Sequence, residues 1–141
     1  MGNDDRIPAI ICDLDGTLAL FNGRGPFEME KCGDDLLNGP VSETVDALNR
    51  RGWQVLLVTG RFEQFRSQTE EWLFKHKVRF HALWMRADGD FRKDAIVKRE
   101  LYEREIAPHY DVLLALDDRN QSVQCWRDLG LTCFQVAPGD F

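Results

Sequence analysis

The stretch Ile10-Ile11-Cys12-Asp13-Leu14-Asp15-Gly16-Thr17-Leu18 decides the fold. An apolar run that starts at Ile7 leads into it, as is typical of a central strand in a parallel sheet. The run then ends in two acids one residue apart. A buried carboxylate is costly unless a cation or hydrogen bonds replace its hydration. Gly16 allows a sharp turn after the acids. The stretch therefore predicts a core strand that ends at a polar site.

The chain is short and acidic, with 141 residues, 43% hydrophobic residues and a net charge of −6. This length favours a single domain over residues 1–141. The sequence has no apolar run long enough for a membrane span and no apolar leader, so we expect a cytoplasmic protein without a membrane association. The negative charge argues against general nucleic-acid binding, but local positive charge would still suit an enzyme that acts on one nucleic-acid end.

Strand and helix patterns alternate about five times along the chain. The predicted strands are Ile7–Cys12, Trp53–Val58, Phe80–Met85, Val112–Leu116 and Leu131–Val136. The first helical pattern begins at Pro40. The others cover Phe62–His76 (a helix, or a loop and then a helix), Lys93–Ile106 and the region around Val123–Leu129. This alternation predicts an α/β fold, a doubly wound parallel sheet of about five strands.

Two segments fall outside this alternation. Residues 1–6 are polar, and we expect them to be flexible. Residues 18–39 are rich in Gly, Pro, Asn and Asp, which is typical of a loop. We interpret them as a short flap, because the segment is too short for a large cap domain. Phe21 or Phe27 in the flap is a candidate for stacking on a nucleobase.

Polar side chains gather where the predicted strands end. They are the Asp13/Asp15 pair, Thr59-Gly60-Arg61, Arg86 and the Asp117-Asp118 pair. Open parallel sheets bind ligands outside the carboxyl ends of their strands. We therefore expect these groups to meet at one edge of the sheet.

The two acids of the first strand suit phosphoryl transfer. Asp13, held by the strand, would attack phosphorus as a nucleophile. Asp15, on the turn, would protonate the leaving oxygen and later activate a water molecule. The alternative is that both acids only cap backbone amides in an Asx turn.

The second acid pair predicts a magnesium site. Adjacent carboxylates at a core edge repel each other, and Mg²⁺ prefers oxygen ligands. The expected ligands are Asp13, the backbone carbonyl of Asp15 and Asp118, with Asp117 bound directly or through water. Alternatively, Asp117 and Asp118 cap the following helix.

Other residues are candidates for phosphate binding. The Thr59 hydroxyl, the amide after Gly60 and the Arg61 guanidinium can all donate to phosphate oxygens. Lys93 or Lys98 could neutralise both phosphate and nucleophile, and spacing alone does not choose between them.

The order Asp13-Leu14-Asp15-Gly16-Thr17, Thr59-Gly60, a lysine and Asp117-Asp118 resembles the haloacid-dehalogenase-type phosphohydrolases. A narrower resemblance, to the phosphatase domain of bacteriophage polynucleotide kinase-phosphatases, covers nearly the whole chain. It rests on residues 22–27, 30–32, 92–94, 106–109, 116–119 and 135–141. Position 59 is Thr where that family has Ser, which keeps the hydroxyl, and the segment after Arg61 is shorter.

This resemblance implies an enzyme that removes 3′-phosphates, and 2′,3′-cyclic phosphates, from DNA or RNA ends through an aspartyl-phosphate. It favours Lys98 over Lys93 as the catalytic lysine. Together with the pattern of the residues, it implies phosphate or substrate roles for Thr17, Arg24, Gly60, Arg61, Arg86, Asp94 and Arg119.

The expected partner is a 5′-kinase or a ligase, in the same protein or a separate one. No G-x-x-x-x-G-K-[ST] motif occurs in these residues, so we expect no ATP site in them.

Two other functions fit the same residues. A 5′(3′)-nucleotidase acting on mononucleotides would share the Asp117-Asp118-Arg119 ending of the fourth strand. A non-catalytic module could use the pocket to hold a phosphorylated end, although such a module would need neither Asp13 nor Asp15.

Overall fold

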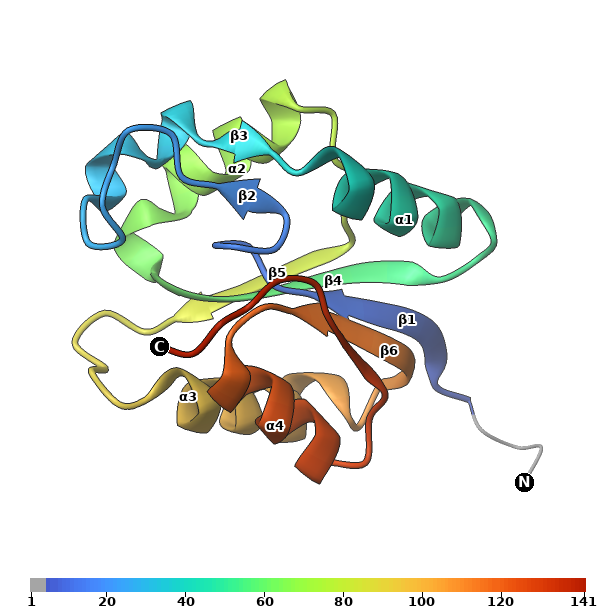
Figure 1. The fold of residues 1–141 in the computed structure, drawn as a ribbon. Coiled ribbons are helices and arrows are strands. Elements are labelled where there is room, and N and C mark those ends of the chain that lie inside the picture. Colours follow the sequence, from blue (N-terminus) through green and yellow to red (C-terminus); the bar gives the residue numbers. More distant parts are fainter. Residues whose placement is uncertain (1–4) are drawn as a thin grey trace.

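The computed structural model describes residues 5–141 and contains a five-stranded sheet in which all strand pairs are parallel. The strand order is β5-β4-β1-β6-β7 (Figure 1). The strands are β1 (Ile7–Cys12), β4 (Gln54–Phe62), β5 (Ala82–Arg86), β6 (Tyr110–Asp117) and β7 (Cys133–Gln135). The predicted doubly wound parallel sheet is confirmed, with β1 at its centre.

Two helices cover each face of the sheet. One face carries α1 (Gly39–Arg50) and α2 (Arg66–Lys75), and the other carries α3 (Asp94–Leu101) and α4 (Asn120–Asp128). Alternate residues of β1 serve the two sides: Ile10 packs in the core with α1 and α2, and Ile11 packs with α3 and α4. Both residues are fully buried, which explains why β1 has no polar face.

Several elements begin or end a few residues from their predicted bounds, and two of them differ further. β4 continues four residues past Val58, because Thr59 and Phe62 still pair with β5 across a shift in register. The predicted helix over Lys93–Ile106 keeps its length, but its last turn, Tyr102–Ile106, winds as a π-helix.

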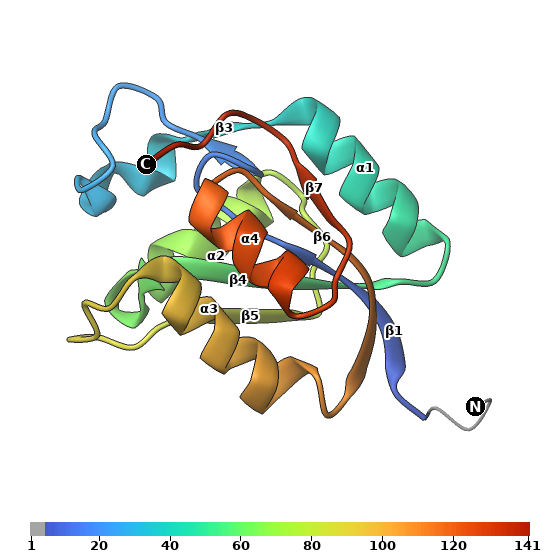
Figure 2. The same cartoon turned by 60° about the horizontal axis from the view of Figure 1, so that its bottom comes forward.

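The flap, predicted over residues 18–39, ends at Asn38 because Gly39 already begins α1. It contains a small hairpin of β2 (Ala19–Leu20) and β3 (Leu36–Leu37), joined through a 3-10 helix (Met29–Asp34). Figures 1 and 2 show that the flap and the loop between β5 and α3 both project beyond the carboxyl ends of the strands. Both segments are therefore placed to border a site at that edge.

The expectation of a flexible start over residues 1–6 lies mostly outside the described residues, since residues 1–4 are not described. Within residues 5–141, no helix combines the length and the apolar character needed to cross a membrane.

Candidate active site

The carboxyl edge of the sheet brings together most of the predicted polar groups. Asp13 directly follows β1, Thr59 lies in β4, and Asp117 and Asp118 stand at the end of β6. Lys98 reaches them from α3. All five side chains are buried. Burying so many charges without pairing them would be costly, so their contacts decide what the site can do.

Lys98 joins the two acid pairs. Its Nζ donates to Asp13 Oδ1 at 3.0 Å and to Asp117 Oδ2 at 2.8 Å, and it lies 3.4 Å from Ser122 Oγ. Burial lowers the pKa of Lys98, but the charges of Asp117, Asp13 and Asp94 outweigh it and hold that pKa well above its usual range. Lys98 is therefore a fixed cation beside Asp13, whereas Lys93 lies exposed.

Protein donors occupy both oxygens of the Asp117 carboxylate. Oδ1 accepts from the backbone amides of Asp118 and Arg119, and Oδ2 accepts from Lys98 and from Trp126 Nε1 at 3.0 Å. Asp117 therefore binds the two backbone amides that precede α4 and also holds Lys98. It is not the N-cap of α4, which is Arg119, so the alternative that this acid only caps the helix is not what the structure shows. Trp126 is fully buried, as expected of a core residue, and its indole N–H is an additional donor to the site.

Asp13 and Asp118 face each other across the Thr17 hydroxyl, which lies 3.1 Å from Asp13 Oδ2 and from Asp118 Oδ1. Burial, with the charge of Asp117, raises the pKa of Asp13 well above its usual range, against the opposing charge of Lys98. Burial also raises the pKa of Asp118. Two buried carboxylates that contact the same hydroxyl group favour a bound cation.

The same acids could hold a divalent metal ion. One oxygen each from Asp13, Asp117 and Asp118 lie within 4.8 Å of one another. Gly16, with a positive φ of 83°, lies so close that a Cβ there would overlap the Asp118 carboxylate. The oxygen-only donor set and this tight turn fit a hard cation such as Mg²⁺. Coordination by the Asp15 carbonyl stays a prediction.

The Asp15 side chain points toward two arginines. Arg61 Nη2 donates to Asp15 Oδ1 at 2.7 Å, and Arg24 Nη2 donates to the same oxygen at 3.1 Å. Both guanidinium groups are buried, whereas the Asp15 side chain keeps 24% of its surface exposed. Asp15 is thus the accessible member of a charged cluster at the mouth of the site.

The fourth member of this cluster is Asp35, which was not predicted from the sequence. Its carboxylate accepts from Arg24 Nε and Nη2, both at 2.8 Å, and from Arg61 Nη2 at 3.1 Å. Its carbonyl accepts from Trp72 Nε1. The only local sign was an acid at the end of a loop-like segment. Its partners lie 11 and 26 residues away, so no spacing rule would find them.

Gly60, in the last part of β4, also borders the site. A Cβ at this position would overlap the Asp94 carboxylate, so any other residue would displace Asp94. Burial raises the pKa of Asp94, but Lys98, Arg86 and Arg119 outweigh it and lower that pKa overall. The Thr59 hydroxyl accepts from the Arg61 amide at 3.1 Å, which leaves its hydrogen to donate.

Arg86 connects the end of β4 to the loop between β5 and α3. Its Nε donates to the Gly60 carbonyl at 2.9 Å, and its Nη2 donates to Asp94 Oδ1 at 2.6 Å. Its remaining nitrogen binds two carbonyls of the β5–α3 loop. Arg86 therefore supports the β5–α3 loop and the Gly60 backbone. Its predicted contact with substrate stays a prediction.

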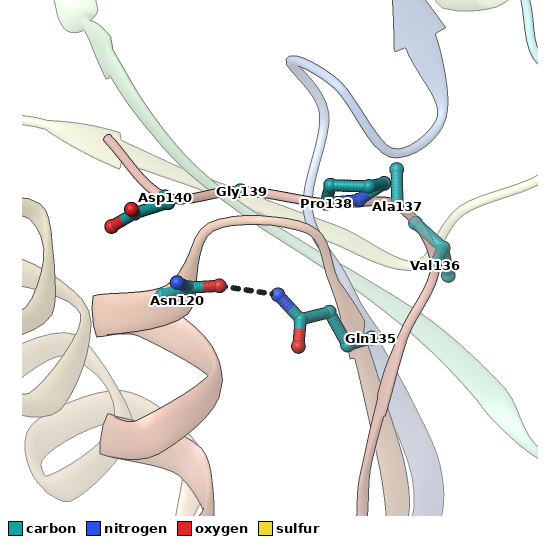
Figure 3. A pocket seen from close by; sticks show the side chains of 7 residues that line it. All are labelled: Asn120, Gln135, Val136, Ala137, Pro138, Gly139 and Asp140. Atoms are coloured by element: carbon teal, nitrogen blue, oxygen red, sulfur yellow. Dashed lines mark hydrogen bonds between the residues drawn. The ribbon is translucent and has the colours of Figure 1, made fainter.

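The C-terminal segment lies beside Asp118. Arg119 Nε donates to the Phe141 carbonyl at 2.8 Å, and Gln135 Nε2 donates to the Asp118 carbonyl and to Asn120 Oδ1 (Figure 3). An open cavity of about 530 Å³ lies between the start of α4 and this segment. Arg119 is half-buried and also lies 3.6 Å from Asp94, so it can reach a ligand at the site.

A comparison with protein families matches residues 7–141 to the model described as the polynucleotide kinase PNKP phosphatase domain. A curated relative, named "Putative bifunctional polynucleotide kinase/RNA ligase" and found in Autographa californica nuclear polyhedrosis virus, is 31% identical over 137 residues. The match covers 94% of this chain and 20% of the relative.

Solved structures give a consistent result. A chain in the structure of a Pnkp1/Rnl/Hen1 complex is 45% identical, with a TM-score of 0.95, covering 99% of this chain and 49% of that one. A class C acid phosphatase from Bacillus anthracis is 15% identical with a TM-score of 0.64, and covers 98% and 69%, so it shows the fold alone. This chain thus spans half or less of the curated relative and of the similar Pnkp1/Rnl/Hen1 chain.

Proposed function

The chain belongs to the family of polynucleotide kinase PNKP phosphatase domains, which are haloacid-dehalogenase-like, and on this basis we propose that it removes 3′-phosphate from polynucleotide ends. We propose 2′,3′-cyclic phosphate as a second substrate. The observation that carries the proposal is the position of Asp13. Lys98 contacts one oxygen of its carboxylate, and Thr17 contacts the other beside Asp118.

The proposed reaction has two steps. In the first, an Asp13 oxygen attacks phosphorus, the bond from phosphorus to the ribose 3′ oxygen breaks, and Asp15 gives that oxygen a proton. In the second, Asp15 takes a proton from water, the water oxygen attacks phosphorus, and the bond to Asp13 breaks to release phosphate. Asp15 suits this role because, unlike Asp35, it is partly exposed and so can reach the leaving oxygen.

Positive charge around the phosphate comes from fixed groups. Lys98 lies against the nucleophile, and the hydrogen of the Thr59 hydroxyl faces no competing acceptor in the described residues. Preorganised donors of this kind stabilise the charge that develops on phosphate oxygens. Mg²⁺ bound by Asp13 and Asp118 would neutralise the phosphate and keep both carboxylates ionised.

The shape of the site favours a polymer end. The flap is short, and within the described residues the largest insertion over the carboxyl edge is the small β2–β3 hairpin with its 3-10 helix. The rest of a polynucleotide could therefore extend out of the site without meeting a large cap domain. We propose that residues 1–141 act as one cytoplasmic phosphatase domain that works with a 5′-kinase or a ligase, as the names of its relatives suggest.

A phosphate-release panel tests the function. The substrates are one oligonucleotide sequence as RNA and as DNA, each with a 3′-phosphate, a 5′-phosphate or, for RNA, a 2′,3′-cyclic end, and a 3′-mononucleotide. We expect the fastest release from a 3′-phosphorylated oligonucleotide. A much faster release from the mononucleotide would show a nucleotidase instead. Binding of the phosphorylated ends without any release would show a non-catalytic module.

A further inference from the structure

Phe91 is an exposed aromatic residue that the chain holds in place from both sides. It lies in the loop between β5 and α3, and 85% of its surface is exposed. Arg86 Nη1 donates to the carbonyl of Asp90 at 3.1 Å and to the carbonyl of Arg92 at 2.6 Å. The backbone on each side of Phe91 is therefore bound to one buried guanidinium.

A second ring supports Phe91 at its edge. Phe62 and Phe91 have ring centroids 5.6 Å apart at 65°, an edge-to-face contact. Phe62 ends β4, three residues after Thr59, one of the predicted phosphate-binding residues. The Arg86 Cζ lies 5.7 Å from the centre of the Phe62 ring. Phe62 therefore lies in the same strand as Thr59, Gly60 and Arg61, and Phe91 packs against Phe62.

The same arginine connects this aromatic pair to the reaction centre. Arg86 donates to Gly60 and to Asp94, and Asp94 lies 3.6 Å from Lys98, which contacts Asp13. The β5–α3 loop also projects beyond the carboxyl edge of the sheet (Figure 2). An exposed ring fixed at this place would meet the part of a substrate that lies next to its terminal phosphate.

We propose that Phe91 is a stacking platform for a nucleobase at the unpaired end of a polynucleotide whose terminal phosphate lies at Asp13. The proposal rests on the proposed function and adds the residue that recognises the polymer. Every nucleobase has a π-face, so stacking is favourable without choosing a sequence. Phe74 is exposed to a similar extent but lies near the end of α2, which leads to the opposite edge of the sheet.

Two matched oligonucleotides test this role. Both are single-stranded and carry a 3′-phosphate, and one lacks the bases of its last two nucleotides. For the unchanged protein, we expect kcat/KM to be about tenfold higher with the complete oligonucleotide, the factor that about 1.4 kcal/mol represents. Phe91→Ala should abolish this preference by raising the KM for the complete oligonucleotide, whereas Phe91→Trp, which keeps an aromatic ring, should retain it. Phe74→Ala is the control and should keep the preference.

The outcomes separate this proposal from the proposed function. If the unchanged protein releases no 3′-phosphate from either oligonucleotide, the function itself is wrong. If it releases phosphate but does not prefer the complete oligonucleotide, or if Phe91→Ala keeps the full preference, Phe91 is not the platform. Thermal melting of each variant shows that it is folded, which we expect because the altered side chains are exposed.

Discussion

Replacing Asp35 with Asn should destabilise the protein and disturb Asp15. Asp35 is 3% exposed and accepts three hydrogen bonds from Arg24 and Arg61. An amide would turn an N–H group toward one of these guanidinium groups and remove the negative charge between them. The backbone carbonyl would still accept from Trp72, so the substitution changes the charge and not the anchoring of the chain.

The size of the effect follows from the contacts. Breaking a buried ion pair by removing one partner costs about 3–5 kcal/mol. Because Asp15 still pairs with Arg24 and Arg61, we expect a value near the lower limit, about 3 kcal/mol. With a urea m-value of about 2 kcal/mol/M, the unfolding midpoint should fall by about 1.5 M.

Urea unfolding of the unchanged protein, Asp35→Asn and Asp34→Asn measures this loss. Asp34 is the matched control, because it is the neighbouring residue and is exposed. Its substitution should change stability by no more than about 0.5 kcal/mol. If Asp35→Asn unfolded at the same urea concentration as Asp34→Asn, the buried charge cluster would not have the importance assigned to it here.

Two further substitutions test the centre of the site. Lys98→Met should lower kcat in a phosphate-release assay by about 10²–10³, because it removes the cation at Asp13. Lys93→Met, at an exposed position, should have little effect. Equal losses in the two variants would contradict the assignment of Lys98. Because the pKa of Asp94 is lowered in the folded state, its contribution to stability is complete above pH about 4 and is lost as pH falls through the folded-state pKa. Urea unfolding at several pH values should therefore show a stability difference between the unchanged protein and Asp94→Asn that shrinks below pH about 4, and a constant difference would refute this electrostatic role.

The sheet could be predicted because each strand carries its own signal. β1 is an apolar run followed at once by acids, and its predicted bounds match the structure. The end of β4 could not be predicted, since Gly60 and Arg61 look like a turn in the sequence, and only the pairing with β5 keeps them in the strand. The β2–β3 hairpin has strands of two residues, which are too short for any periodicity.

The site was predictable where its residues follow strands and unpredictable where they depend on distant partners. The edge that gathers Asp13, Thr59 and Asp117 follows from the rule for parallel sheets. Asp35 has no such signal, because its importance comes from two arginines that only the folded flap brings together. The choice of Lys98 over Lys93 needed either a family resemblance or the geometry of α3.

The most direct test of the account is phosphate release by Asp13→Asn. The assay uses a 3′-phosphorylated oligonucleotide with Mg²⁺, and Asp111→Asn, an exposed position at the start of β6, is the matched control. We predict that Asp13→Asn lowers the rate by about four orders of magnitude or more, while Asp111→Asn keeps it. If Asp13→Asn released phosphate within tenfold of Asp111→Asn, the proposed aspartyl-phosphate mechanism would be wrong.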